Sequence, residues 1–280
     1  MKTSRFAVLS LAAALLGAPA LAANKVSFKD PSGDDNGPGA YKYPTDPVYK
    51  RGSFDLTEFT FDKKGAKADV SLGFNTTLED PWKTGSGFSV QMAFIFIDTD
   101  GKPGSGSTDS LPGLNVKFAP EFGWEKVIVI SPQGSARVKA EVGNKAGASK
   151  DNVIVPTRTK GSGRKITASI DTAGLEGEPS NWRFQVLVQS NEGFPAGNDL
   201  LTRKVNEYEG QHRFGGGNDG ECDPHVMDLL AGAGKGEASE AKAQQEMLSF
   251  ECAEDGTAKK PATLTMVGAA TKPVAAEEQK

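Results

Sequence analysis

The sequence predicts an all-β fold: a single β-sandwich domain that ends in short C-terminal helices. The chain has 33 Gly and 16 Pro among 280 residues, above the roughly 12% that the two types usually supply together. Many short segments rich in β-branched and aromatic residues are separated by turn signals, a spacing typical of a sandwich. Helix-forming composition occurs only late, from residue 223 onward. These observations argue against a helical bundle.

The first residues resemble an export signal. Lys2 and Arg5 precede an apolar stretch at residues 6–16, and Ala20-Leu21-Ala22 is a small-residue cleavage motif. The stretch is shorter than the ~20 residues that span a bilayer; the alternative is a retained anchor. We expect a signal peptide at residues 1–22, a binding domain at 23–268 and no transmembrane segment. The mature protein would then lie in the periplasm, on the cell surface or outside the cell.

The first strands are predicted at residues 53–61 and 67–75, joined by a polar turn at 62–65. Residues 88–97 give the strongest strand signal and indicate a central strand, because Ile95 and Ile97 make its end apolar on both faces. Its other face would carry Phe88, Val90, Met92, Phe94 and Phe96.

Further strands are expected at residues 125–131, 135–142, 151–155, 165–170 and 182–189. The last alternates apolar residues with Arg183, Gln185 and Gln189, which predicts one solvated face. Helices are expected at 225–230, after an Asp-Pro start, and at 238–249. Residues 269–280 have little to bury, and we expect a disordered tail.

Cys222 and Cys252 are the only cysteines. An even count in an exported chain predicts a disulfide, which would tie the C-terminal helical region to the glycine-rich turn before it. The alternative is a pair of thiolate metal ligands.

Residues 30–49 combine Asp, Gly, Pro and Tyr in an irregular loop. Carboxylates and turn carbonyls are the ligands that calcium prefers, so Asp34 and Asp35, followed by Asp30, are candidate calcium ligands. The alternative is a turn in which the Asp side chains accept hydrogen bonds from backbone amides.

A second candidate calcium loop covers residues 98–109. Asp98 and Asp100 resemble the start of an EF-hand loop, but Asp109 stands where that motif has Glu, and flanking helices are missing. This pattern favours a mobile loop with some calcium affinity over an EF-hand.

Four aromatic residues near predicted loops are candidate sugar-stacking side chains: Tyr41, Tyr43, Trp82 and Trp124. Trp82 lies in a turn and is the better exposed candidate. The alternative for all four is a place in the core, which is favoured for Trp124 because an apolar strand follows it.

The usual catalytic motifs are absent, including G-x-S-x-G, H-E-x-x-H and the Walker A loop. With 36 acidic residues, a pair of glycosidase carboxylates cannot be singled out. Two His exclude a three-His zinc site, and a net charge of −4 argues against a nucleic-acid partner. His212 and His225, with Met227 nearby, leave open a copper-binding redox protein, similar to superoxide dismutase.

Eight motifs, in this order, resemble the C-terminal module of glucodextranase-type and amylopullulanase-type bacterial enzymes: DPSGDDNGPGAYKYPTDPVY, GSFDLTEF, PW, GFSVQMAFIFIDTD, LPGLNV, WEKVIVIS, HRFGGG and DPHVMDLL. The resemblance covers roughly residues 26–268, and the cysteine pair departs from it. It implies a β-sandwich that binds polysaccharide or the cell surface, while catalysis belongs to a separate domain of those enzymes.

The resulting prediction is a stand-alone exported binding module of the cell envelope. It would bind polysaccharide or surface-layer material, be stabilised by calcium and have no enzymatic activity. The copper redox protein and a glycan hydrolase remain the alternatives.

Overall fold

The structure is a computed structural model that describes residues 24–232 and 239–268. The predicted signal peptide and the predicted tail at 269–280 lie outside the described residues. No helix of the described part is long and apolar enough to cross a membrane.

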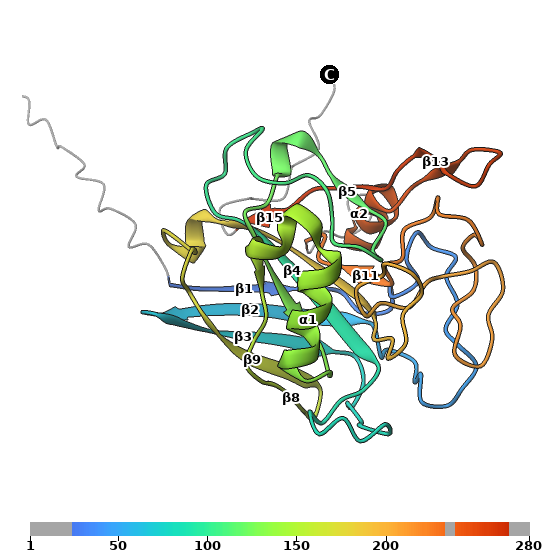
Figure 1. Ribbon diagram of the computed structural model, residues 1–280, viewed down its shortest axis with the longest axis horizontal. Helices are drawn as coiled ribbons and strands as arrows, with labels where there is room; N and C mark the ends of the chain where they lie inside the picture. Colours follow the sequence, from blue (N-terminus) through green and yellow to red (C-terminus); the bar gives the residue numbers. More distant parts are fainter. Residues whose placement is uncertain (1–23, 233–238, 269–280) are drawn as a thin grey trace, which may run out of the picture.

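Two β-sheets pack face to face, which confirms the all-β sandwich (Figure 1). The first sheet is antiparallel throughout. Its strands, in spatial order, are β1 (Lys25–Lys29), β2 (Leu56–Lys64), β3 (Lys67–Phe74), β9 (Lys165–Asp171) and β8 (Thr159–Ser162).

The second sheet is mixed, because its edge strand β7 pairs in parallel with β6. In spatial order it contains β11 (Asp228–Leu229), β10 (Arg183–Ser190), β4 (Gln91–Asp98), β6 (Lys126–Ile130) and β7 (Val153–Ile154), with β15 (Val267–Gly268) also paired to β10.

The helices and the small sheets surround this sandwich. The helices are α1 (Ser135–Lys145), α2 (Glu240–Met247) and the 3-10 turns η1 (Pro120–Phe122), η2 (Gly147–Asn152) and η3 (Pro179–Asn181). The remaining strand pairs are β5 (Lys117–Phe118) with β14 (Thr263–Leu264) and β12 (Glu251–Cys252) with β13 (Ala258–Lys260).

The main core lies between the two large sheets. At its centre the ring of Phe184 on β10 contacts Phe59 on β2 edge-to-face, with ring centroids 5.4 Å apart. Phe61 and Trp182 extend this aromatic cluster.

A second core covers the other face of the six-stranded sheet. Met92, Phe94 and Phe96 of β4 lie in it, and α1 packs over it through Val138 and Val142. All eight residues of β4 are therefore buried, as expected for a central strand.

The prediction that one face of β10 is solvated is wrong, because the second core covers that face. Gln185 and Gln189 are fully buried. Their side-chain amides are satisfied by backbone carbonyls: Gln185 Nε2 donates to Thr265 at 2.9 Å, and Gln189 Nε2 donates to His225 at 2.5 Å. Buried amides of this kind are tolerated when they are hydrogen-bonded.

Three further predictions about secondary structure need correction. Residues 135–142 form the helix α1 and not a strand, because Val138 and Val142 lie one helical turn apart on the buried side. Residues 225–230 form no helix, since Asp228–Leu229 pairs with β10 as β11. Phe88 and Val90 belong to the main core, while Met92 lies in the second core, because the strand begins only at Gln91.

The predicted hairpin at 53–75 is confirmed, with a tighter turn than expected. Lys64 pairs with Lys67, so the turn consists of Gly65 and Ala66. Gly65 has φ +64°, a left-handed conformation that glycine adopts without strain.

The predicted disulfide is confirmed. Cys222 and Cys252 are bonded, with their Cα atoms 5.2 Å apart. The bond joins the loop before β11 to the strand β12, so the covalent loop contains β11 and α2.

Candidate functional site

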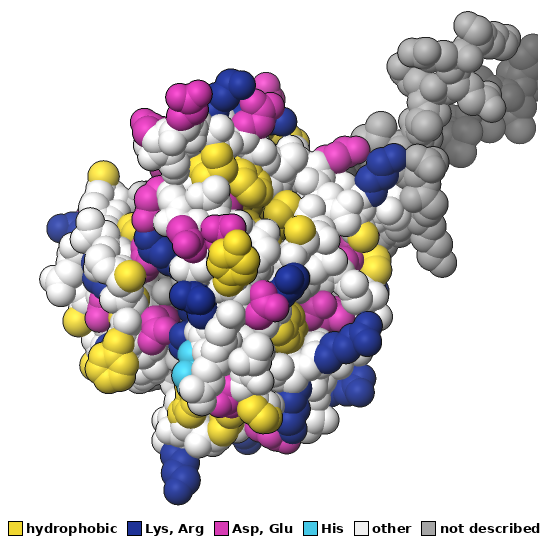
Figure 2. All heavy atoms as spheres, turned by 90° about the vertical axis from the view of Figure 1, so that its right-hand side faces the viewer, with side chains coloured by type: hydrophobic (Ala, Val, Ile, Leu, Met, Phe, Trp, Pro, Cys, Tyr) yellow, Lys and Arg dark blue, Asp and Glu magenta, His cyan; other side chains and the backbone are white. Residues whose placement is uncertain are grey.

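The loops at one end of the sandwich form a groove of about 540 Å³. It is bounded by the loop before β4, the β6–α1 turn and the loops that follow β10. The lining residues are Trp82, Thr84, Pro132, Gln133, Gly134, Arg137, Asn191, Glu192, Gly193, Phe194, Arg203 and His212. Figure 2 views the end where the loops gather and shows hydrophobic side chains scattered among charged ones.

Two aromatic side chains of the groove are open to solvent. Phe194 is 93% exposed and Trp82 is 39% exposed. The Trp82 ring leans against Tyr49, with ring centroids 6.3 Å apart. An aromatic ring that is exposed on one side and supported on the other can stack against an apolar ligand face.

The backbone beside Trp82 is fixed by the Asp80 carboxylate. That group accepts hydrogen bonds from the backbone amides of Thr84 and Gly85, both at 2.8 Å, and from the Ser89 hydroxyl at 2.5 Å. Burial acts to raise the pKa of Asp80, but these hydrogen bonds outweigh it and lower the pKa. The carboxylate therefore holds this loop in place at neutral pH.

Polar groups fixed by ion pairs and hydrogen bonds line the rest of the groove. Arg203 pairs with Glu192 at 2.8 Å, and its guanidinium lies over the Tyr49 ring. Arg137 Nη1 donates to Gln133 Oε1 at 3.1 Å. Planar guanidinium and amide groups beside exposed rings suit a ligand that has both hydroxyl groups and apolar faces.

Among the four aromatic candidates, Trp82 is exposed and two others lie in the core. Trp124 is fully buried against Phe96, with ring centroids 5.2 Å apart. Tyr41 is also buried, and its hydroxyl donates to the Pro224 carbonyl at 2.6 Å. Tyr43 is half-buried, accepts a hydrogen bond from the Phe54 amide at 3.0 Å and donates to Asp35. These three side chains are therefore not exposed stacking platforms.

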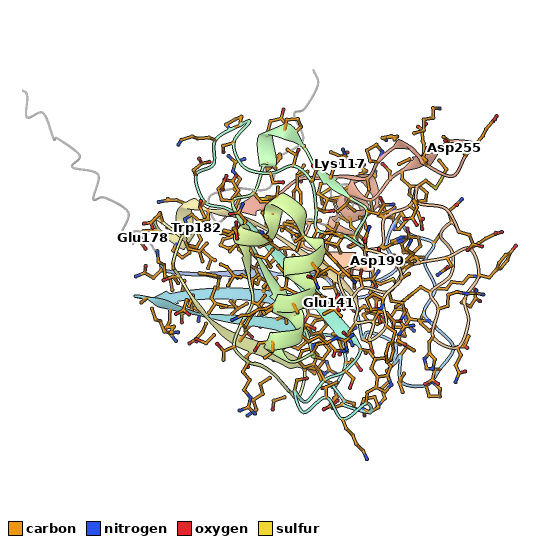
Figure 3. All side chains as sticks on the ribbon, in the orientation of Figure 1. Lys117, Glu141, Glu178, Trp182, Asp199 and Asp255 are labelled. Atoms are coloured by element: carbon orange, nitrogen blue, oxygen red, sulfur yellow. A yellow bond between two sulfur atoms is a disulfide. The ribbon has the colours of Figure 1, made fainter. Side chains whose placement is uncertain are left out.

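Phe194 was missed by the sequence reasoning. It lies in the polar, glycine-containing loop after β10, a setting similar to that of Trp82. An aromatic residue inside a turn-rich segment was the available signal. The third tryptophan, Trp182, is buried in the main core and lies beside Glu178 (Figure 3).

A separate cluster contains five buried carboxylic side chains: Asp30, Asp34, Asp55, Asp228 and Glu240. Asp30, Asp34 and Glu240 form one group in which ligand oxygens lie within 4.8 Å of one another. Asp34, Asp55 and Asp228 form a second group by the same measure. Asp34 belongs to both.

Burial and mutual repulsion act on these carboxylic groups. Burial first, and then the charges of Asp228, Glu240, Asp34 and Asp55, raise the pKa of Asp30. Burial also raises the pKa of Asp228, and it raises that of Glu240 to about 9 and that of Asp55 to about 6. Protons or a cation must therefore compensate the charge of this cluster.

Of the three Asp residues predicted as ligands in the segment 30–49, the structure brings Asp30 and Asp34 into this cluster. Asp35 is not part of it, because its carboxylate accepts a hydrogen bond from the Tyr43 hydroxyl. Asp55, Asp228 and Glu240 were not predicted, and no local pattern marks them, since they come from distant parts of the chain.

The second predicted calcium loop brings Asp98 and Asp100 together with Glu125. Its carboxylates already have donors. Asp98 Oδ1 accepts from the Gly101 amide at 2.7 Å, and Asp98 Oδ2 lies 3.3 Å from Arg183 Nε. Glu125 Oε2 accepts from the Thr99 amide at 2.8 Å. The loop is thus held by hydrogen bonds and an ion pair.

The two histidines lie in different environments. His225 is buried, and its Nδ1 accepts a hydrogen bond from the Val205 amide at 3.3 Å. His212 is exposed and lies 4.0 Å from Asp46. No group of three or more metal-ligand side chains in the described part of the chain contains either histidine, so the geometry gives no support to the copper alternative.

The sandwich fold and the exposed groove suit a binding module. The chain belongs to the family described as the C-terminal, SLH-like binding module of glucodextranase, which matches residues 26–267. This confirms the resemblance seen in the sequence, and membership indicates a carbohydrate-binding role. A comparison with curated proteins found no match.

Proposed function

We propose that this protein is a non-catalytic carbohydrate-binding module of the cell envelope. Its ligand is a polysaccharide or surface-layer material, and the groove beside Trp82 and Phe194 is the binding site. The observation that carries the proposal is that two exposed aromatic side chains line the same groove. Membership of a binding-module family supports the same role.

Sugar rings have apolar C–H faces and polar edges. In the groove, Trp82 and Phe194 offer surfaces for the apolar faces, while Gln133, Arg137 and Glu192, none of which is buried, offer donors and acceptors for the hydroxyl groups.

Export of the protein is supported by the Cys222–Cys252 disulfide, since such bonds persist in oxidising compartments. The periplasm, the cell surface and the extracellular medium all satisfy this condition.

The test is binding of the purified protein to soluble α-glucans, measured by affinity electrophoresis and titration calorimetry, and to isolated cell-wall material, measured by co-sedimentation. Trp82→Ala and Phe194→Ala should each weaken binding by about tenfold, the equivalent of roughly 1.4 kcal/mol. Both side chains are exposed, so the melting temperature should change little.

Tyr208→Ala is the matched control. This ring is 64% exposed but does not line the groove, and its removal should leave binding unchanged. Equal losses in all three variants would show non-specific adhesion. Sustained release of reducing sugar from the same α-glucans would refute the non-catalytic assignment.

A further inference from the structure

The five buried carboxylates come from parts of the chain that are far apart in sequence. Asp30 and Asp34 follow β1, Asp55 precedes β2, Asp228 lies on β11, and Glu240 begins α2. Their side chains are at most 7% exposed. Carboxylates are rarely buried together unless each is compensated.

Backbone and amide donors compensate part of the cluster. Asp228 accepts from the amides of Leu56 at 2.6 Å and of its neighbour Leu229 at 2.8 Å. One oxygen of Asp55 accepts from the Gly33 amide at 2.8 Å and from Asn75 Nδ2 at 3.0 Å.

With the carboxyl groups ionised, the other oxygens have no donor in the described part of the chain; a proton on Glu240, shared with Asp34, is the alternative to a cation. Both carboxylate oxygens of Asp30 and both of Asp34 are buried without a hydrogen-bond partner, and so are Asp55 Oδ1 and Glu240 Oε2. The side chains of Asp30 and Asp34 are more than nine-tenths buried. Leaving such oxygens unpaired is costly in a protein interior.

Positively charged side chains do not compensate them either. Within residues 24–232 and 239–268, none of the five carboxylates forms an ion pair with Lys, Arg or His. The acidic group at Asp98 differs in this respect, because Arg183 lies against it.

We propose that this cluster is a buried calcium site in which Asp34 is the shared ligand, flanked by Asp30 and Glu240 on one side and by Asp55 and Asp228 on the other. Every available ligand atom is an oxygen, which favours a hard cation over zinc or copper. Calcium accepts six to eight oxygens in irregular geometry, whereas magnesium requires a regular octahedron.

Bound calcium would link the segment after β1, which carries Asp30 and Asp34, to β11 and α2. Gln244 of α2 already reaches this segment, because its Nε2 donates to the Asp34 backbone carbonyl. Since these segments lie about two hundred residues apart, the ion would stabilise the native state and not the unfolded chain.

The experiment uses purified, exported protein after chelator treatment, with CaCl₂ as the probe in calorimetry and thermal unfolding. Saturable binding is expected. Calcium at a hundred times its dissociation constant should raise the melting temperature by roughly 5–10 °C. Magnesium at the same concentration should give a smaller rise, and an equal one would contradict the assignment to calcium.

The adjacent residues Asp34 and Asp35 provide the matched comparison. Asp34→Asn should lower calcium affinity at least tenfold, and the melting temperature of its calcium-free form should be no lower than that of chelated wild type, because one charge of the cluster is removed. Asp35→Asn should retain the calcium response.

If Asp34→Asn does not fold, Asp30→Asn serves instead, because neither of its oxygens accepts a hydrogen bond in the structure. The proposal is overturned if wild-type protein binds no calcium, or if the folded Asp34 or Asp30 variant responds to calcium as wild type does.

Discussion

Removing the Cys222–Cys252 disulfide should destabilise the protein by several kcal/mol. The two cysteines are 30 residues apart. In the chain-entropy description, opening a covalent loop of this size gives the unfolded chain about 12 cal/mol/K of entropy, or roughly 3.7 kcal/mol at 25 °C. This corresponds to a fall in melting temperature of roughly 7–15 °C for a domain of this size.

The perturbation is the double variant Cys222→Ala with Cys252→Ala, which leaves no free thiol. Alanine suits the buried Cys222 because it introduces no unpaired polar group. The variant should remain folded, because both large sheets lie outside the covalent loop except for the short strand β11.

The assay is guanidinium unfolding of wild type and variant, with the slope of the transition compared as well as its midpoint. Mass spectrometry of an unreduced digest should show one peptide pair that is linked through the two cysteines. Two freely alkylated thiols, or a difference in unfolding free energy below about 1 kcal/mol, would refute the reasoning.

The remaining predictions concern His225 and Phe184. Burial lowers the pKa of His225 to about 4 in the folded protein, whereas an unfolded chain has a His pKa of about 6.5. Between about pH 6.5 and pH 4 the unfolded state therefore binds more protons than the folded state, and the free energy of unfolding falls as the pH falls. Wild-type protein should therefore lose stability between pH 7 and pH 4.5, and the variant His225→Gln should lose roughly 2–3 kcal/mol less over the same range, as measured by urea titrations. An equal loss in the two proteins would contradict the lowered pKa of His225. Phe184→Ala should cost about 3–5 kcal/mol, because the fully buried ring joins the two sheets. Phe194→Ala, at an exposed site, is the control and should lower the free energy of unfolding by less than about 0.5 kcal/mol. Similar losses in the two variants would contradict a main core centred on Phe184.

Most of the sheet framework could be predicted from the sequence. The strands β2, β3, β4, β6, β9 and β10 each lie within or largely overlap a predicted segment. Their apolar residues recur with the period of an extended chain, which is a local signal. The helix α1 was mistaken for a strand because Val138 and Val142 are compatible with either period in so short a segment.

The candidate sites were predicted only in part. The exposed Trp82 could be recognised from its turn, and the Asp-rich segment from its composition. Nothing in that segment separates Asp34, which faces the buried cluster, from Asp35, which contacts Tyr43. The distinction depends on the direction in which each side chain leaves an irregular backbone.

The sequence by itself determined the sandwich class, the cysteine pairing and the family, because each depends on residue types, local periodicity or the order of motifs along the chain. Only the tertiary structure decided which polar residues are buried and what meets them. Gln185 is buried because other segments cover the outer face of β10. Asp55, Asp228 and Glu240 surround Asp34 because sheet pairing and helix packing bring distant segments together, and no local pattern encodes a contact of that range.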